Sequence, residues 1–137
     1  MTATTDENEL DVDESPFEDF SPRTAFLEWL TDHLAHIEVV RGKPTPWCDQ
    51  WWLHTEAVAR FVALWKARLQ ADANMVENLE ADSLWWLTHW DRHAQVIFDK
   101  THGPFRDCDP HNGHLSRSGG ASPLTAIAQP PAEIPLL

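Results

Sequence analysis

The chain has 137 residues and a formal net charge of −12, and it contains eight tryptophans and no tyrosine. One domain of this size can be stable because each buried aromatic side chain removes about 150–250 Å² from water, whereas the ten Lys and Arg residues form no cluster of the kind that binds nucleic acid directly. No apolar run approaches the roughly 20 residues that span a bilayer, and the N-terminus is acidic where a signal peptide is basic and then apolar, so we expect a cytoplasmic protein that does not bind membranes.

The two ends of the chain differ in composition from its middle. Residues 1–20 contain eight acidic residues and no Lys or Arg, and such a segment buries too little apolar surface to fold. Residues 109–137 contain five prolines and a Ser-Gly stretch, a composition typical of flexible tails. We therefore expect a disordered acidic tail at residues 1–20, a helical Trp/His-rich domain at residues 21–110, and a disordered Pro-rich tail at residues 111–137.

Three helices are predicted in the middle of the chain, so the expected fold is an all-α, small three-helix bundle. The first begins at Ser21-Pro22, a cap residue followed by proline at the first helical position, and runs to about residue 38. The second begins near Asp49, a favourable N-cap, and runs to about residue 70. The third runs from about residue 82 to residue 100, and a Gly103-Pro104 turn follows it.

Histidines fall on the apolar faces of all three predicted helices. At 100° per residue, His54 lies among the apolar residues of the second helix, and His89 and His93 lie among those of the third. His33 falls on the buried side of the first helix. Polar groups in a small core are costly unless they are bonded, so these histidines require partners.

A structural metal site would give these buried histidines a partner. His89 and His93 are four residues apart and share a helical face, while Cys48 directly precedes the second helix and Cys108 follows the Gly-Pro turn. Two thiolates and two imidazoles are a common tetrahedral zinc set. Five candidate ligands, the fifth being His54, compete for four places around a zinc ion.

The same residues also allow alternatives to a metal site. Buried indole N–H groups need acceptors, and neutral imidazoles supply them. Cys48 and Cys108 are alternatively paired in a disulfide, which would close a long loop. A catalytic role is not expected, because Glu56 and Asp91 each lie two residues from a histidine, about 200° around the helix, and point away from it. Phosphate-binding loops and serine-nucleophile signatures are also missing from the sequence.

A family resemblance runs through the middle of the chain. The residues that carry it are Trp47-Cys48, Trp51-Trp52, His54, Glu56-Ala57, Arg60, Leu64-Trp65, Trp86, His89, Asp91, His93, Gly103-Pro104-Phe105 and Cys108. Their order resembles an actinobacterial domain of unknown function that occurs on plasmids, phages and other mobile elements, over roughly residues 25–110. The resemblance implies this biological setting, and it brings no established activity, cofactor or catalytic residue.

The function expected from the sequence is that of a non-enzymatic accessory protein of a mobile element or phage. It would act by binding another protein and would contain a structural zinc site. One alternative is a metal-dependent enzyme that acts on a small or nucleotide substrate, which requires an open position on the metal. A second alternative is an acidic DNA mimic, in which the charge of residues 1–20 occupies the groove of a DNA-binding protein.

Overall fold

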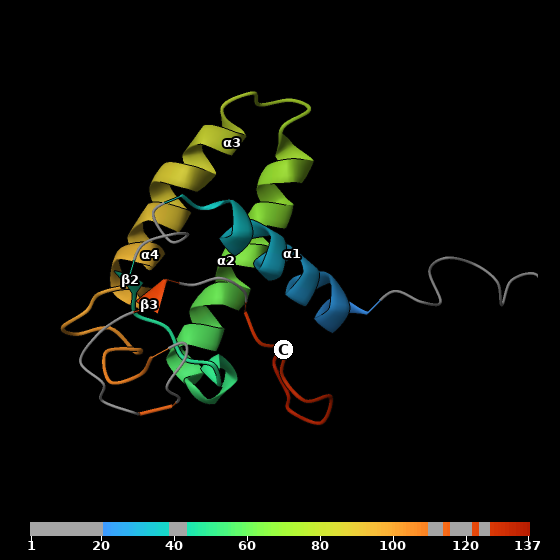
Figure 1. Ribbon diagram of the computed structural model, residues 1–137. Coiled ribbons are helices and arrows are strands. Elements are labelled where there is room, and N and C mark those ends of the chain that lie inside the picture. The colour runs from blue at the N-terminus through green and yellow to red at the C-terminus, as the bar shows by residue number, and fades with distance from the viewer. Residues whose placement is uncertain (1–20, 39–43, 110–113, 116–121, 124–126) are drawn as a thin grey trace, which may run out of the picture.

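The computed structural model describes residues 21–38, 44–109, 114–115, 122–123 and 127–137. Within these residues the fold is all-α, as predicted, with three helices packed around a tryptophan-rich core (Figure 1). The acidic tail expected at residues 1–20 lies outside the described residues. Every described helix falls short of the combined length and hydropathy that a membrane-spanning segment requires.

The first helix, α1 (Pro22–His36), begins where the sequence predicts it. The side chain of Ser21 accepts a hydrogen bond from the backbone N–H of Thr24 at 3.3 Å, and Pro22 occupies the first turn, where a missing N–H costs nothing. The inner face of α1 buries Phe26, Leu30 and Leu34. This spacing of four residues places all three side chains on the face that contacts α2.

The second helix, α2 (Thr55–Asn74), begins later than the predicted start near Asp49. Between them lies a short 3-10 turn, η3 (Trp51–Leu53), and His54 is the N-cap of α2, with extended backbone angles of φ −94° and ψ 96°. The turn forms because Trp51 must be buried, and it is fully inaccessible to solvent. The spacing of 100° per residue predicts that His54 lies on the inner face of a helix, and this prediction is wrong. His54 lies at the N-terminal end of α2 instead.

The third helix consists of α3 (Ala81–Leu84), a π-helical segment η4 (Trp85–Trp90) and α4 (Asp91–Ile97) in unbroken succession. Trp85 and Trp90 are both buried although they are five residues apart, a separation that in a regular helix points side chains about 140° away from each other. Hydrogen bonds from i to i+5 in η4 bring both indoles to the core. The wider π-helical turn adds one residue to the helix relative to regular α-helix. His89, which lies in this turn, is exposed.

The core is made mainly of aromatic side chains from all three helices and the loops that join them. Its largest fully buried members are Trp47, Trp51, Trp85, Phe26, Phe61 and Phe105. The indole N–H of Trp85 donates to the carbonyl of Leu64 at 3.1 Å, and the indole N–H of Trp51 donates to the carbonyl of Ala128 at 2.9 Å. Backbone carbonyls, rather than histidines, are thus the acceptors for these two buried indoles.

The end of the chain lies against the helices. The C-terminal segment, residues 127–137, runs beside α1 and η3 (red in Figure 1), although its composition predicts part of a disordered tail. Before it, the two-residue strand β3 (Ser122–Pro123) pairs antiparallel with β2 (Pro44–Thr45).

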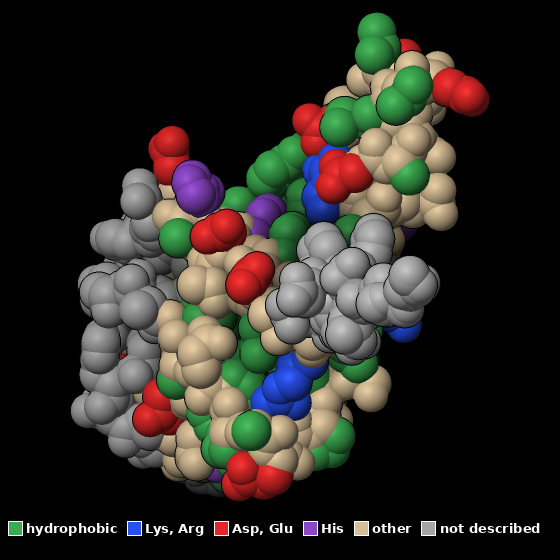
Figure 2. Space-filling view, turned by 90° about the vertical axis from the view of Figure 1, so that its right-hand side faces the viewer, with side chains coloured by type: hydrophobic (Ala, Val, Ile, Leu, Met, Phe, Trp, Pro, Cys, Tyr) green, Lys and Arg blue, Asp and Glu red, His purple; other side chains and the backbone are tan. Residues whose placement is uncertain are grey.

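The turn between α2 and α3 projects from the body of the domain, at the end opposite to the two strands (Figure 2). Its Val76 and Leu79 are each 87% exposed.

Candidate metal centre

Four side chains with metal-binding atoms meet at one point beside the N-terminus of α2. They are Cys48, His54, Cys108 and His114, and their four donor atoms all lie within 4.8 Å of one another. We call them the Cys/His cluster. Both cysteines are free and buried, and both histidines are half-buried. Part of the cluster therefore faces solvent through its imidazole rings, while the sulfur atoms are covered.

Each member of the cluster is positioned by an irregular piece of backbone. Cys48 lies in the loop before η3, and the 3-10 turn that follows it delivers His54 at the N-cap of α2. Cys108 lies after the tight turn that follows α4, in which the N–H of Gly103 donates to Asp99 O at 3.0 Å. His114 follows Cys108 by six residues. Two separate loops, one between α1 and α2 and one after α4, thus meet at the cluster.

Four of the six separations between the donor atoms are close to the edges of a tetrahedron around one ion. His54 Nε2 and His114 Nδ1 are 3.2 Å apart, and Cys108 Sγ lies 3.5 Å from the first and 3.8 Å from the second. Cys48 Sγ lies 3.2 Å from His114 Nδ1. Zinc–nitrogen bonds of about 2.0–2.1 Å and zinc–sulfur bonds of about 2.3 Å give tetrahedral edges of about 3.3 Å between nitrogens and about 3.6 Å between nitrogen and sulfur. The cluster could therefore hold a metal ion without a large rearrangement.

Backbone amides support both sulfur atoms. The N–H of Gln50 donates to Cys48 Sγ at 3.4 Å, and the N–H of Leu115 donates to Cys108 Sγ at 3.2 Å. Hydrogen bonds of this kind stabilise a thiolate and orient a ligand toward its metal. Each cysteine thus has a donor from its own loop, as expected of residues that bind a cation as anions.

The electrostatics of the cluster without a cation favour neutral ligands. Burial raises the pKa of the Cys48 thiol to about 12, while the Gln50 amide opposes this shift and the nearby Cys108 and Asp49 add to it. Burial, and then His114, lower the pKa of His54, so its imidazole is neutral and has a lone pair to donate. A bound divalent cation would instead lower the pKa of the thiol, because coordination removes its proton.

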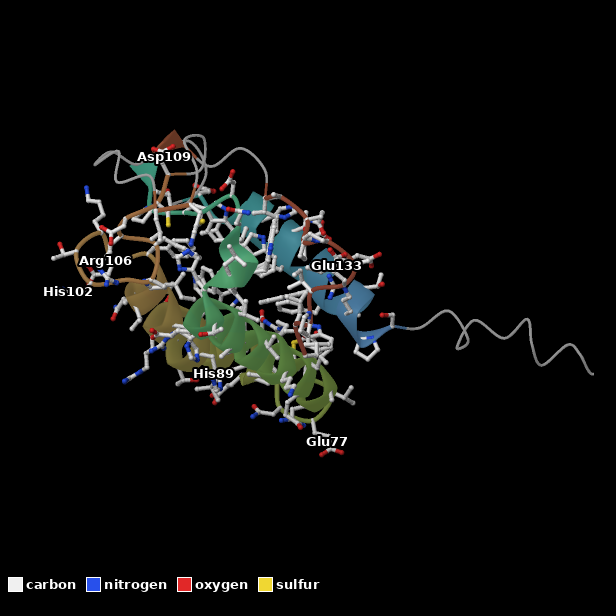
Figure 3. All side chains as sticks on the ribbon, turned by 90° about the horizontal axis from the view of Figure 1, so that it is seen from below. Glu77, His89, His102, Arg106, Asp109 and Glu133 are labelled. Carbon is white, nitrogen blue, oxygen red and sulfur yellow. The ribbon has the colours of Figure 1, made fainter. Side chains whose placement is uncertain are left out.

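Two of the candidate ligands expected from the sequence, His89 and His93, lie outside the cluster. His89 is exposed beside a groove between α2 and α3, and Figure 3 shows it well separated from Asp109, the neighbour of Cys108. His93 accepts a hydrogen bond from the guanidinium of Arg60 at 3.1 Å. Burial, followed by the charge of Arg60, lowers the pKa of His93. The structure therefore brings together Cys48, His54 and Cys108 from the expected set.

The fourth member, His114, is missing from the expected set because the Pro-rich composition assigns it to a tail. A signal for it is nevertheless present. The sequence Cys-Asp-x-x-x-x-His occurs twice, as Cys48-Asp49 with His54 and as Cys108-Asp109 with His114. Asp109 is buried, and one carboxylate oxygen of Asp49 is buried without a hydrogen-bond partner in the described part of the chain. The repeated spacing indicates two equivalent ligand loops.

The fold and the cluster define a class of protein: a small all-α domain in which the loop between α1 and α2 and the loop after α4 meet at a Cys2His2 cluster. The chain belongs to the family described as a domain of unknown function (DUF4913), whose model matches residues 19–128. The match includes all four members of the cluster. Searches of curated proteins and of solved structures find no match to this chain.

Proposed function

We propose that this protein is a non-enzymatic, zinc-stabilised binding module that acts by binding another protein. The observation that carries the proposal is the convergence of four donor atoms in the Cys/His cluster, four of whose six separations are close to tetrahedral edges. Zinc is the metal of choice because two thiolates and two imidazoles are a common ligand set of structural zinc sites. The resemblance to an actinobacterial domain of mobile elements supports an accessory role on a phage or plasmid.

A structural role for the metal follows from the number and origin of its ligands. Four protein ligands fill a tetrahedron and leave no corner for water, whereas a catalytic zinc keeps one corner open. This count favours a stabilising ion over the alternative of a metal-dependent enzyme. The ion would join the loop before α2 to the loop after α4, and such sites add on the order of 10 kcal/mol to folding. The helices would then present a rigid surface to a partner.

Metal analysis of the purified full chain tests this proposal. We expect about one zinc per chain by mass spectrometry, lost in Cys48→Ser and in Cys108→Ser. His93→Ala is the matched control, since this histidine is bound to Arg60 outside the cluster, and it should retain the metal. Replacement by Co²⁺ should give the visible absorption of a tetrahedral site with thiolate ligands. Metal-free wild-type protein that folds normally in the presence of zinc would overturn the proposal.

A further inference from the structure

The projecting end of the α2–α3 helix pair exposes apolar side chains that the core does not use. Five of the ten large apolar side chains exposed in the described residues lie within residues 76–87, namely Val76, Leu79, Leu84, Trp86 and Leu87. Val76 and Leu79, in the turn, do not pack against the core. Exposed apolar side chains that occur singly are ordinary, whereas a concentration of them marks an interaction surface.

A groove of about 310 Å³ between α2 and α3 lies next to these side chains. Alanines line it on both helices, Ala67 and Ala71 on α2 and Ala81 on α3. Asn78 lines the groove beside the turn, and Leu84 lines it on the third helix. Small residues on both sides leave space that a larger apolar side chain from another molecule can fill. We call Val76, Leu79, Leu84 and this groove the tip surface.

The backbone that carries the tip surface is held by hydrogen bonds and ion pairs. In the turn, the N–H of Glu80 donates to Oδ1 of Asn78 at 3.0 Å. Below the turn, the guanidinium of Arg68 pairs with Asp72 of α2 and with Asp82 of α3, at 2.7 Å each, and so ties the two helices together. The apolar side chains are therefore presented in a fixed arrangement, which lowers the entropic cost of binding a partner.

The charge around the tip surface is acidic. Residues 69–88 contain four carboxylates and no Lys or Arg. Arg68 pairs with two of them, whereas Glu77 and Glu80 are exposed and form no ion pair with any described residue. Figure 2 shows hydrophobic and acidic side chains together on the projecting end, and in Figure 3 Glu77 lies at its outer limit. The surface thus combines apolar contacts with an attraction for positive charge.

We propose that the tip surface is a docking site for a basic, amphipathic helix of a partner protein. Apolar side chains three or four residues apart on such a helix enter the groove, and its Lys and Arg side chains face Glu77 and Glu80. The proposal rests on the protein-binding part of the proposed function and is independent of the metal. A second copy docked through the same surface, or the acidic residues 1–20, would bring further carboxylates against these two glutamates, so both are poor occupants.

A labelled synthetic peptide of about 14 residues, with leucines along one helical face and lysines on the other, serves as the probe. It is titrated against the full-length protein by fluorescence anisotropy. Leu79→Gln combined with Leu84→Gln should weaken binding at least about tenfold, because two apolar contacts are lost. Leu69→Gln, at an exposed leucine of α2 that does not line the groove, is the matched control and should bind as the wild type does. All three leucines are exposed, so these variants should fold normally by circular dichroism.

A second pair of variants tests the charge. Glu77→Gln combined with Glu80→Gln should weaken binding about threefold at low salt and make it less dependent on salt. Glu28→Gln combined with Glu133→Gln removes the same charge from other exposed positions and should bind as the wild type does. A peptide of the same composition with its leucines spread around the helix should bind more weakly than the amphipathic one.

Three results would overturn the proposal. They are the absence of peptide binding, equal binding by the Leu79→Gln, Leu84→Gln variant and the wild type, and sedimentation that shows a dimer which this variant abolishes. The last result would assign the tip surface to a second copy. The zinc content of the same preparations separates this proposal from the zinc proposal. Zinc-containing protein that does not bind the peptide overturns the docking site alone, and peptide binding by zinc-free Cys48→Ser supports the docking site alone.

Discussion

Nε2 of His54 lies 3.2 Å from Nδ1 of His114, although sixty residues separate them in the chain. Two nitrogen atoms at this distance are either linked by one shared proton or held by one cation. Both sulfur atoms of the Cys/His cluster lie within 4.8 Å of the same nitrogens. One cation bound by all four atoms would account for the whole arrangement, and the following predictions test this assignment.

The identity of the ligands is the first prediction. His114→Ala should lower the affinity for Co²⁺ by more than about 100-fold, since loss of a direct ligand costs more than loss of its supporting hydrogen bond. His89→Ala should bind Co²⁺ as the wild type does, because this side chain is exposed outside the cluster. Titration followed by the visible spectrum measures both affinities. If His89→Ala abolishes the tetrahedral spectrum and His114→Ala does not, the cluster is wrongly assigned.

Removal of the metal should weaken the fold as a whole. Treatment with a chelator is expected to lower the free energy of unfolding by several kcal/mol, because metal binding energy in such sites is folding energy. Urea unfolding followed by tryptophan fluorescence measures the change, and re-addition of zinc should restore it. The Cys48→Ser variant is the control: its unfolding curve should not respond to the chelator. An equal response in both proteins would show that the chelator acts elsewhere.

The stability of the domain should depend on pH through His33. Its ring stacks on Trp29 at 5.0 Å and meets the edge of Trp90 at 4.3 Å. Burial, and then the charges of Arg68 and His36, lower its pKa to about 4. The unfolded chain binds a proton near pH 6.5 and the folded chain only near pH 4, so this contribution is complete above pH 6.5 and is lost as the pH falls towards 4.

The expected loss from His33 is about 2–3 kcal/mol, measured as the difference in unfolding free energy between pH 7 and pH 4. His33→Phe keeps an aromatic ring in the same place and cannot titrate, so its stability should fall less over this interval. The comparison removes the contribution of the carboxylates, which both proteins share. Parallel pH profiles for the two proteins would exclude His33 as the source.

Gly103 is predicted to be essential for the second ligand loop. A Cβ atom at this position would lie 2.6 Å from Asp99 O and 2.7 Å from Val96 O, and backbone oxygens cannot move aside as the end of a flexible side chain can. Gly103→Ala should therefore cost about 1–3 kcal/mol of stability and, by displacing Cys108, reduce the affinity for metal. The neighbouring His102→Ala, whose side chain is 84% exposed, should change neither quantity in a metal titration and an unfolding experiment.

Local signals were sufficient to predict the first helix. Ser21 and Pro22 define its start through a cap and a fixed φ, and Phe26, Leu30 and Leu34 define its inner face. Both effects act within one or two turns of the chain, so they need no knowledge of the neighbouring helices. The all-α class follows in the same way from three periodic segments separated by Gly- and Pro-containing loops.

The second and third helices depart from the predicted geometry where tertiary packing overrides it. Burial of Trp51 holds a 3-10 turn where the sequence predicts regular helix, and burial of both Trp85 and Trp90 holds a π-helical segment. Each departure moves a histidine: His54 to the N-cap of α2 and His89 to the outer surface. A helical wheel assumes a constant step of 100° per residue, so it cannot represent a 3-10 turn or a π-helical segment.

The sequence by itself determined the fold class, the first helix and the chemical types of the residues in the candidate metal centre, because these depend on composition and on spacings of a few residues. Only the tertiary structure decided which histidines join Cys48 and Cys108. The two Cys-Asp-x-x-x-x-His loops are separated by the whole of α2 and the third helix, and their approach depends on how the helices pack. Long-range packing also placed residues 127–137 against α1 and η3. Arg23 and Trp51 bind backbone carbonyls there, and since every residue has such a carbonyl, the sequence does not show which ones are bound.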